Sequence, residues 1–252
     1  MTTQRKYPSS QIKILYGLAA GRCAFPECRR EVILEATSDE ERKQIGKIAH
    51  IVGHSDDGPR GDPTYPRDKL DIYENWILLC PTCHDTIDAL DNEYTVAYLR
   101  ELKVKHMEWV RTSLTTEMIT ISFAELEVVA NAIATTYTVP FEDFTVTSPK
   151  EKMQRNSLTD HVHMLLTIGL SMTKEVSKFV QHFALVDAEY PERLKAGFIL
   201  EYARLRAEGV FGDALFESMR QFSCAGSHDF KRQAAGLAVL SYLFECCEVF
   251  EK

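Results

Sequence analysis

The sequence has no excess of Lys and Arg over Asp and Glu. Proteins that bind nucleic acid usually have such an excess. Its 252 residues include 29 Lys and Arg against 37 Asp and Glu, a formal net charge of -8. Residues 1–115 carry 16 basic and 18 acidic side chains, and residues 116–252 carry 13 and 19, which together give that total. Because phosphate contacts need positive charge, only the nearly neutral first part is expected to offer a local basic face. The acidic second part is more typical of a protein-contact or regulatory module.

The sequence also lacks a long apolar run and the pattern of a secretory leader. The apolar stretch near the N-terminus is interrupted by Lys13, and no suitable small-residue cleavage site follows. We therefore expect a cytoplasmic protein that makes no membrane contact. In a reducing compartment the seven cysteines are not expected to form a disulfide framework.

Four of the seven cysteines form two close pairs. Cys23 and Cys28 enclose the turn Ala-Phe-Pro-Glu, and Cys80 and Cys83 enclose Pro-Thr. Structural zinc takes four tetrahedral ligands, and two ligands a few residues apart form a chelate without strain. The sequence therefore predicts a structural Zn²⁺ site made by these four residues. The alternative is four unrelated reduced thiols, but cysteine is rarely found in exposed proline-rich turns without a metal.

The order of apolar runs and turns predicts two strands followed by a helix around the second cysteine pair. A segment rich in Gly, Pro and Asp separates the two strands and must form a loop. The elements expected in this part are helix 11–20, strands 31–35, 45–52 and 73–79, and helices 81–90 and 95–113.

Polar residues at defined places in this unit suit phosphodiester hydrolysis with one metal ion. Such a reaction needs a base for the attacking water, a cation for the phosphate, and a group that fixes the base. His50, on the first strand, is the candidate base. His84 and Asp88 are four residues apart on a helix, so they project from one face as candidate metal ligands. Asn75, at the start of the second strand, can hydrogen-bond across the loop.

Together these motifs resemble the HNH endonucleases of the ββ-α-metal class. The matching segments are 48–51, 58–61 and 73–88, and the resemblance extends over about residues 15–112. It is closest to HNH domains fused to regulatory modules in bacterial anti-phage defence effectors, including those activated by cyclic oligonucleotides.

The resemblance implies roles for three residues. His50 would be the general base, Asn75 the middle asparagine, and His84 the last histidine, which binds a catalytic Mg²⁺ or Mn²⁺. Many HNH enzymes carry Asp, Glu or His directly before the base, but this chain has Ala49 there. The missing ligand would come from Asp88 as the first choice.

Further polar residues leave alternatives open. His54 is the second choice for the missing ligand, although an ordinary loop histidine is the more common case. Arg60 and Arg67 lie in the loop and can clamp a substrate phosphate, or they can be solvated loop charges. Lys103 and Lys105, together with Arg111, form either a DNA-facing stripe or a solvated helix face. His106 is expected to be solvated or packed.

The second part of the chain shows no residues with metal-site or catalytic spacing, and helices are expected to dominate it. Segments 205–216 and 237–250 resemble C-terminal domains of ABC-three-component defence systems. The stretch 234–244 is apolar nearly all round, which indicates a helix buried within the domain or in a subunit interface. Cys224, Cys246 and Cys247 are expected to be buried as small hydrophobes. The elements expected here are helices 124–135, 157–186, 191–208, 212–223 and 229–250, with an extended linker over 136–150.

These observations predict an α+β chain: a zinc-stapled ββ-α-metal (HNH) nuclease domain over 1–115, followed by an all-α domain over 116–252. The expected function is metal-dependent hydrolysis of DNA phosphodiester bonds, as an effector of anti-phage defence controlled by the helical domain. That domain is expected to bind a protein partner or regulatory subunit and to form homo-oligomers. The alternative is a non-catalytic, zinc-stabilised adaptor that binds DNA or protein.

Overall fold

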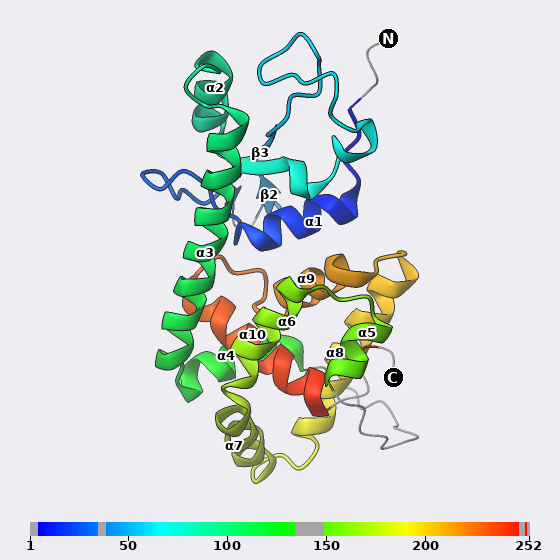
Figure 1. The fold of residues 1–252 in the computed structure, drawn as a ribbon. Helices are drawn as coiled ribbons and strands as arrows, with labels where there is room; N and C mark the ends of the chain where they lie inside the picture. Colours follow the sequence, from blue (N-terminus) through cyan, green and yellow to red (C-terminus); the bar gives the residue numbers. More distant parts are fainter. Residues whose placement is uncertain (1–4, 35–38, 135–148, 247–249, 251–252) are drawn as a thin grey trace. The chain divides into compact units, whose positions relative to one another are not determined.

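The computed structural model describes residues 5–34, 39–134, 149–246 and 250 of the chain. The chain divides into two units, Met1–Val110 and Arg111–Lys252. The class is α+β, as predicted: the first unit holds small antiparallel hairpins, and the second is helical over its described residues (Figure 1). The boundary lies at Val110, whereas the sequence led us to place it at residue 115. No helix in the described part of the chain is long and apolar enough to cross a membrane.

Two antiparallel strand pairs are found in the described part of the first unit. Strand β3 (Lys47–His50) pairs with β4 (Trp76–Leu79), in a register that places Lys47 opposite Leu79 and His50 opposite Trp76. Strand β4 contacts both helix α1 (Ser9–Leu18) and helix α2 (Pro81–Ala89). It is therefore buried along its whole length, which explains its uninterrupted apolar sequence.

Two details of these strands differ from the sequence prediction. The expected strand 73–79 begins only at Trp76, because Tyr73–Asn75 form a short 3-10 helix, η2. The expected strand 31–35 is reduced to β1 (Ile33–Leu34), which pairs with the unforeseen strand β2 (Lys43–Gln44). Residues 35–38, between these strands, lie outside the described part.

Helix α2 begins where the sequence predicts, and helix α3 (Val96–Thr120) is longer than predicted. Pro81 stands at the first helical position, where its missing N–H removes no hydrogen bond. The buried residues Val110, Leu114 and Met118 repeat every four positions, so the apolar stripe of α3 continues beyond the expected end at residue 113. The core of the first unit includes Leu15, Trp76, Ile77, Leu79, Ile87 and Leu99.

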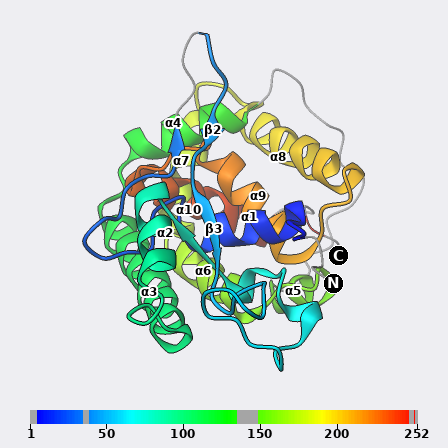
Figure 2. The ribbon, with the colours of Figure 1, turned by 90° about the horizontal axis from the view of Figure 1, so that it is seen from above.

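The second unit is built around helix α10 (Phe230–Cys246), which contacts α4, α6, α7 and α9 (Figures 1 and 2). Its middle residues are buried on all sides, as the apolar stretch 234–244 predicts. Helix α6 crosses it closely at Gly169, where a Cβ atom would lie 2.7 Å from the Leu237 carbonyl oxygen. The helices in the described part of this unit are the end of α3 from Arg111 onwards, α4 (Phe123–Ile133), α5 (Pro149–Arg155), α6 (Asp160–Leu170), α7 (Thr173–Ala184), α8 (Tyr190–Ala207), α9 (Gly212–Ser223) and α10.

Three predictions for the second unit need correction. The single helix over 157–186 is wrong: it is interrupted at Ser171 and Met172, so that α7 can turn its apolar stripe towards α4, α8 and α10. Most of the linker 136–150 lies outside the described residues, and its last two positions belong to α5. Cys224 is buried as expected, but Cys246 is exposed at the end of α10, and Cys247 is outside the described part.

His106 of α3 is buried in the first unit, where it joins α3 to the end of α1. Its Nε2 donates to the Ala19 carbonyl at 3.1 Å, and its Nδ1 accepts from the Arg29 guanidinium. The ring also stacks on Trp109 at 5.5 Å. Burial, and then the charge of Arg29, lower the pKa of His106 to about 4. The folded unit therefore keeps this imidazole neutral.

We expect the first unit to lose stability through His106 as the pH falls. The unfolded chain takes up this proton near pH 6.5, but the folded unit resists it down to about pH 4. The contribution of the neutral His106 to the free energy of unfolding is therefore fully present above pH 6.5. It is lost as the pH falls from 6.5 towards 4. In urea unfolding followed by the fluorescence of Trp76 and Trp109, the free-energy gap between the protein and His106→Gln should shrink by about 1 kcal/mol between pH 7 and 5.5. Parallel pH curves would contradict this.

Candidate active site and metal centre

The four cysteines of the two pairs come together in the first unit. Cys23 and Cys28 lie in the turn after α1, Cys80 follows β4, and Cys83 lies in the first turn of α2. Their Sγ atoms all lie within 4.8 Å of one another, and those of Cys28 and Cys80 are 3.8 Å apart. Ligands about 2.3 Å from a tetrahedral zinc ion are about 3.8 Å from one another. The cluster can therefore hold a structural metal ion, and the geometry suits zinc.

The surrounding backbone holds these thiols in place. The Cys83 amide donates to the Cys80 Sγ at 3.5 Å, and the Ala24 amide donates to the Leu78 carbonyl at 3.0 Å. Burial raises the pKa of Cys23 to about 11, because a thiolate loses its hydration inside the protein. A divalent cation bound to the sulfurs would remove this cost. The donor set therefore fits the predicted zinc.

His50 ends β3 and is only 7% exposed. Its Nε2 lies 2.9 Å from Oδ1 of Asp71, whose Oδ2 accepts the backbone N–H of Lys6 at 2.7 Å. The Nε2 atom of His54 is 3.8 Å from the same Oδ2. Burial lowers the pKa of His50, although Asp71 opposes this effect. The imidazole is therefore neutral near pH 7 and able to accept a proton.

Asn75 is buried and closes the base of the loop between β3 and β4. Its Oδ1 accepts the amide of Val52 at 2.9 Å, and its Nδ2 donates to the carbonyls of Val52 and Leu70 at 3.1 and 3.2 Å. Its own carbonyl accepts the amide of Ile51 at 2.8 Å. These are the hydrogen bonds across the loop that the place of Asn75 in the sequence predicts. They fix the end of β3, and with it His50.

A cavity of about 80 Å³ lies beside His50. His84 and Asp88, one helical turn apart on α2, both line it, with Nδ1 of His84 3.6 Å from Oδ2 of Asp88. Arg5 and Arg60 line the same cavity. The fold thus brings the candidate base, two candidate metal ligands and two cations to one place.

The side chain of Arg60 is hydrogen-bonded to helix α2. Its guanidinium donates to the Ile87 carbonyl at 2.8 Å and to Oδ1 of Asp88 at 2.7 Å. Its backbone has a left-handed φ of 57°, which is uncommon for a residue with a side chain and is often found at functional sites. The loop is also tight at Gly53, where a Cβ atom would lie 2.3 Å from the Pro59 carbonyl oxygen. Arg60 therefore orients Asp88, while its role as a phosphate clamp stays a prediction.

The position before the base provides no ligand. Ala49 lines the cavity and is buried, but it has no donor atom. His54 also lines the cavity, yet its Nε2 is directed to Asp71. Asp88, the first choice for the missing ligand, shares one face of α2 with His84.

Three residues that lie near His50 were not predicted from the sequence. Asp71 is 21 positions from His50 and belongs to no motif, so only the fold brings them together. Arg5 lines the cavity, and the ring of Tyr7 lies 6.1 Å from that of His50 and 5.5 Å from that of Trp76.

Lys103 does not fit the proposed DNA-facing stripe with Lys105 and Arg111. Lys103 donates to the carbonyls of Tyr73 and Glu74, and its burial lowers its pKa to about 8. Lys103 thus supports the short helix that carries Asn75. Lys105 is exposed and paired with Glu101 at 2.6 Å, which agrees with a solvated helix face.

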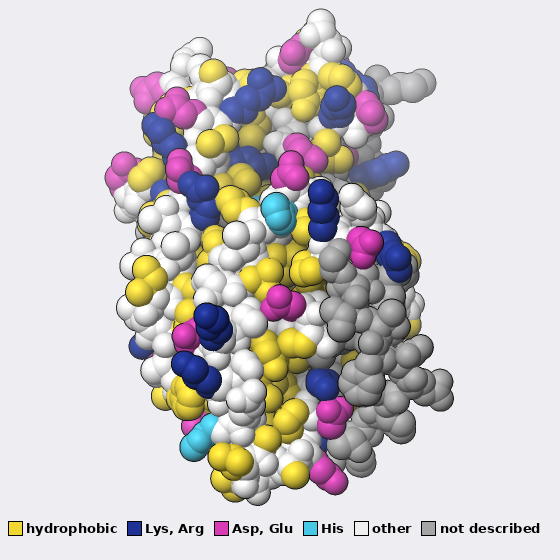
Figure 3. Space-filling view, turned by 60° about the horizontal axis from the view of Figure 1, so that its bottom comes forward, with side chains coloured by type: hydrophobic (Ala, Val, Ile, Leu, Met, Phe, Trp, Pro, Cys, Tyr) yellow, Lys and Arg dark blue, Asp and Glu magenta, His cyan; other side chains and the backbone are white. Residues whose placement is uncertain are grey.

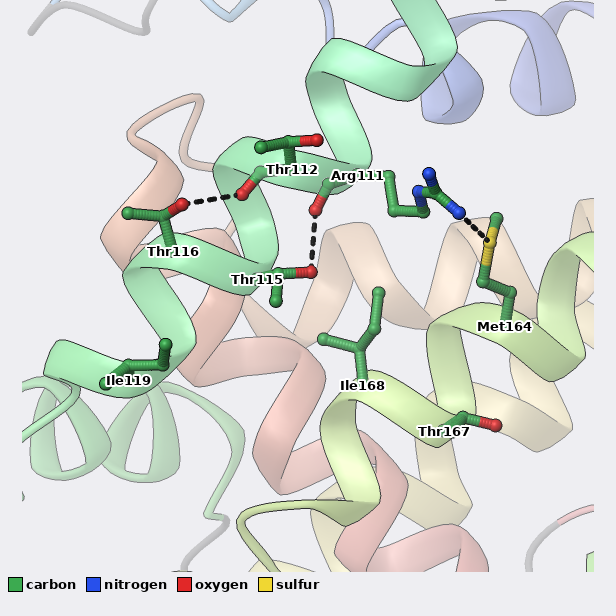
Figure 4. Close-up of a pocket in the computed structure, with 8 residues that line it drawn as sticks. All are labelled: Arg111, Thr112, Thr115, Thr116, Ile119, Met164, Thr167 and Ile168. Atoms are coloured by element: carbon green, nitrogen blue, oxygen red, sulfur yellow. Dashed lines mark hydrogen bonds between the residues drawn. The ribbon is translucent and has the colours of Figure 1, made fainter.

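A second, open cavity of about 490 Å³ lies in the helical unit between the end of α3 and α6. Figure 4 shows Ile119 of α3 on one side and Ile168 of α6 on the other, with the Arg111 guanidinium reaching from α3 to the sulfur of Met164 at 3.6 Å. The Thr115 hydroxyl donates to a carbonyl of its own helix, as do those of Thr116 and Thr167. The lining is therefore more typical of a contact surface than of a catalytic site.

Apolar side chains are also exposed on the helical unit. Ile119, beside the second cavity, is 81% exposed, and Leu185 and Val186 after α7 are each 87% exposed. Figure 3 shows hydrophobic side chains between scattered charged ones on the face that is lowest in Figure 1. Apolar side chains that are exposed together mark protein contacts, whereas single ones are common on any surface.

Comparison of the chain with models of known protein families and with curated proteins gives no match.

Proposed function

We propose that the first unit is a metal-dependent endonuclease of the HNH, or ββ-α-metal, class that hydrolyses phosphodiester bonds of DNA. One observation carries the proposal: His50 from β3, and His84 with Asp88 from α2, line a single cavity. Asn75 hydrogen-bonds the two ends of the intervening loop together. This arrangement agrees with the roles that the sequence resemblance implies for His50, Asn75 and His84.

Each residue then has a chemical task. His50 takes a proton from the attacking water, for which its lowered pKa keeps it in the neutral form. His84 and Asp88 would hold Mg²⁺ or Mn²⁺, which when bound would neutralise charge on the phosphate and the leaving oxygen. Arg60 donates to Oδ1 of the Asp88 carboxylate, and Oδ2 of the same carboxylate lies 3.6 Å from Nδ1 of His84. Arg5 lines the cavity, so its charge can attract the substrate phosphate.

The four-cysteine cluster has a structural role in this proposal. It joins the turn after α1 to the start of α2, the helix that carries His84 and Asp88. Zinc bound there would stabilise a unit whose hairpins contribute only four short strands.

The helical unit is proposed to control the nuclease through a protein contact, with a partner subunit or with a second copy. Its acidic composition disfavours a position along DNA. Its second cavity, where Ile119, Met164 and Ile168 lie among threonines, and the exposure of Ile119 support a protein contact. An effector of bacterial anti-phage defence needs such control, because an unregulated nuclease would damage the host's own DNA.

The alternative, a non-catalytic zinc-stabilised adaptor, is supported by two observations. Ala49 contributes no ligand, and Arg60 occupies one oxygen of Asp88. A plasmid-cleavage assay of the full chain with Mg²⁺ or Mn²⁺, alone and with co-purified partners, separates the two functions. Cleavage that EDTA abolishes and that His84→Ala weakens supports the nuclease, whereas DNA binding without cleavage in every condition supports the adaptor.

We expect the full chain to self-associate through the surface that Ile119 of α3 forms with Met164 and Ile168 of α6. Light scattering after size exclusion should give a mass of twice the single chain at micromolar concentration. Ile119→Glu should weaken the association at least about tenfold, because a buried carboxylate loses its hydration. Val104→Glu is the matched control, since Val104 is also an exposed apolar residue of α3, at 63%, but belongs to the first unit. Equal masses for both variants would contradict the assignment of the surface.

A further inference from the structure

We propose that Asp71 is the positioning residue of the catalytic centre, holding the His50 imidazole in the tautomer that presents Nδ1 as the proton acceptor. The inference rests on the proposed nuclease function for the identity of the reaction. Asp71 lies outside the motif segments 48–51, 58–61 and 73–88, and the fold brings it to His50.

The Asp71 carboxylate is fixed at both of its oxygens. Oδ2 accepts the Lys6 backbone N–H at 2.7 Å, so the carboxylate cannot easily rotate, and Oδ1 lies 2.9 Å from Nε2 of His50. An ionised carboxylate can only accept hydrogen bonds. Nε2 of His50 must therefore carry the proton that the bond requires. The lone pair then stays on Nδ1, the atom that can receive a proton from water.

The negative charge of the Asp71 carboxylate also affects the protonated form of His50. The groups that act on His50 are Asp71, His54 and Arg5, and the cavity wall adds Arg60, His84 and Asp88. Within the described part of the chain, Asp71 is the carboxylate hydrogen-bonded to His50. His50 acquires a positive charge when it takes the proton, and burial disfavours that charge. The adjacent carboxylate offsets this cost during the reaction.

A purely structural role for Asp71 is the competing explanation. Its bond to Lys6 holds the segment before α1, and Tyr7 of that segment packs on Trp76. An anchor of this kind would affect thermal stability and the placement of Arg5. It would not set the tautomer of His50 or the pH dependence of the rate.

The test compares Asp71→Asn with Asp68→Asn, a matched loss of charge at an exposed carboxylate three residues earlier. We expect Asp71→Asn to lower kcat for plasmid cleavage on the order of 100-fold or more, with KM within about twofold of the parent value. The acid limb of the pH profile should move to lower pH, because the carboxylate raises the pKa of His50. Asp71→Glu should restore part of the rate, and Asp68→Asn should leave it unchanged.

A readout without catalysis makes the result independent of the proposed function. In the ¹⁵N spectrum of histidine-labelled full chain, assigned with His50→Ala, Nε2 of His50 should be protonated and Nδ1 unprotonated. Asp71→Asn should shift this tautomer balance even if the chain cleaves no DNA. The proposal is overturned if the parent protein carries the proton on Nδ1. It also fails if Asp71→Asn reduces activity only by lowering Tm, with an unchanged pH profile. If Asp71→Asn does not fold, the activity of Asp71→Glu and the ¹⁵N spectrum of the parent protein test the proposal instead.

Discussion

The His50→Ala variant is expected to lose plasmid cleavage by roughly two to four orders of magnitude, the usual cost of removing a positioned base. His50 is the imidazole at the end of β3 that lines the cavity shared with His84 and Asp88. Without it, the attacking water has no neutral base at this position. The rate with saturating Mg²⁺ or Mn²⁺ is the measurement.

The loss must be separated from a loss of structure or of metal. His50→Ala should keep its zinc content and its Tm within a few degrees, because Asn75 and the β3–β4 pairing still hold the loop. His163→Ala, at an exposed histidine of α6, is the matched control and should cleave normally. His84→Ala should instead raise the metal concentration that is needed for cleavage. Cleavage by His50→Ala at the parent rate would exclude this residue as the base.

The Cys80→Ser variant is expected to lose its zinc and to unfold the first unit while the helical unit persists. Cys80 is 1% exposed and stands between β4 and α2, so its sulfur joins the strand, the helix and the cluster. Structural zinc contributes on the order of 10 kcal/mol in small domains, comparable with the whole stability of a typical domain. The loss of one thiolate is therefore sufficient to shift the equilibrium to the unfolded state.

Two spectroscopic signals separate the units. Both tryptophans, Trp76 and Trp109, lie in the first unit, so a red shift of their emission reports its unfolding. Far-UV circular dichroism should keep most of its helical signal from residues 111 onwards. Elemental analysis should give one zinc per chain for the parent and for Cys224→Ser, a buried cysteine outside the cluster. A metal-free parent protein that is fully folded would refute the structural role.

Local patterns in the sequence were sufficient for several elements. The close spacing of Cys80 and Cys83 after an apolar strand, with Pro81 between them, predicted both the cluster and the start of α2. The all-round apolar stretch 234–244 predicted the buried helix α10. Each of these signals is local, because it follows from helix geometry, proline chemistry or the ligand spacing within one cysteine pair. The two cysteine pairs meet only in the fold, since Cys28 and Cys80 are 52 positions apart.

Other predictions were wrong because contacts between distant segments determine where those helices and strands begin and end. The expected helix 157–186 breaks after Leu170, because α6 and α7 each pack on α10 as separate helices. The expected strand 73–79 starts as a 3-10 helix, whose carbonyls are held by Lys103 from α3. Periodicity along the chain contains no information about either partner.

The sequence by itself determined the α+β class, the two cysteine pairs, and the order of His50, Asn75 and His84 along the chain. Only the tertiary structure decided which side chains surround them. Asp71 meets His50 from 21 positions away, and Arg60 is paired with Asp88 from 28 positions away. The reason is physical: ligand spacing and helical periodicity are local properties, whereas the hydrogen bonds of a buried imidazole or guanidinium depend on which segments the folded core brings within about 3 Å.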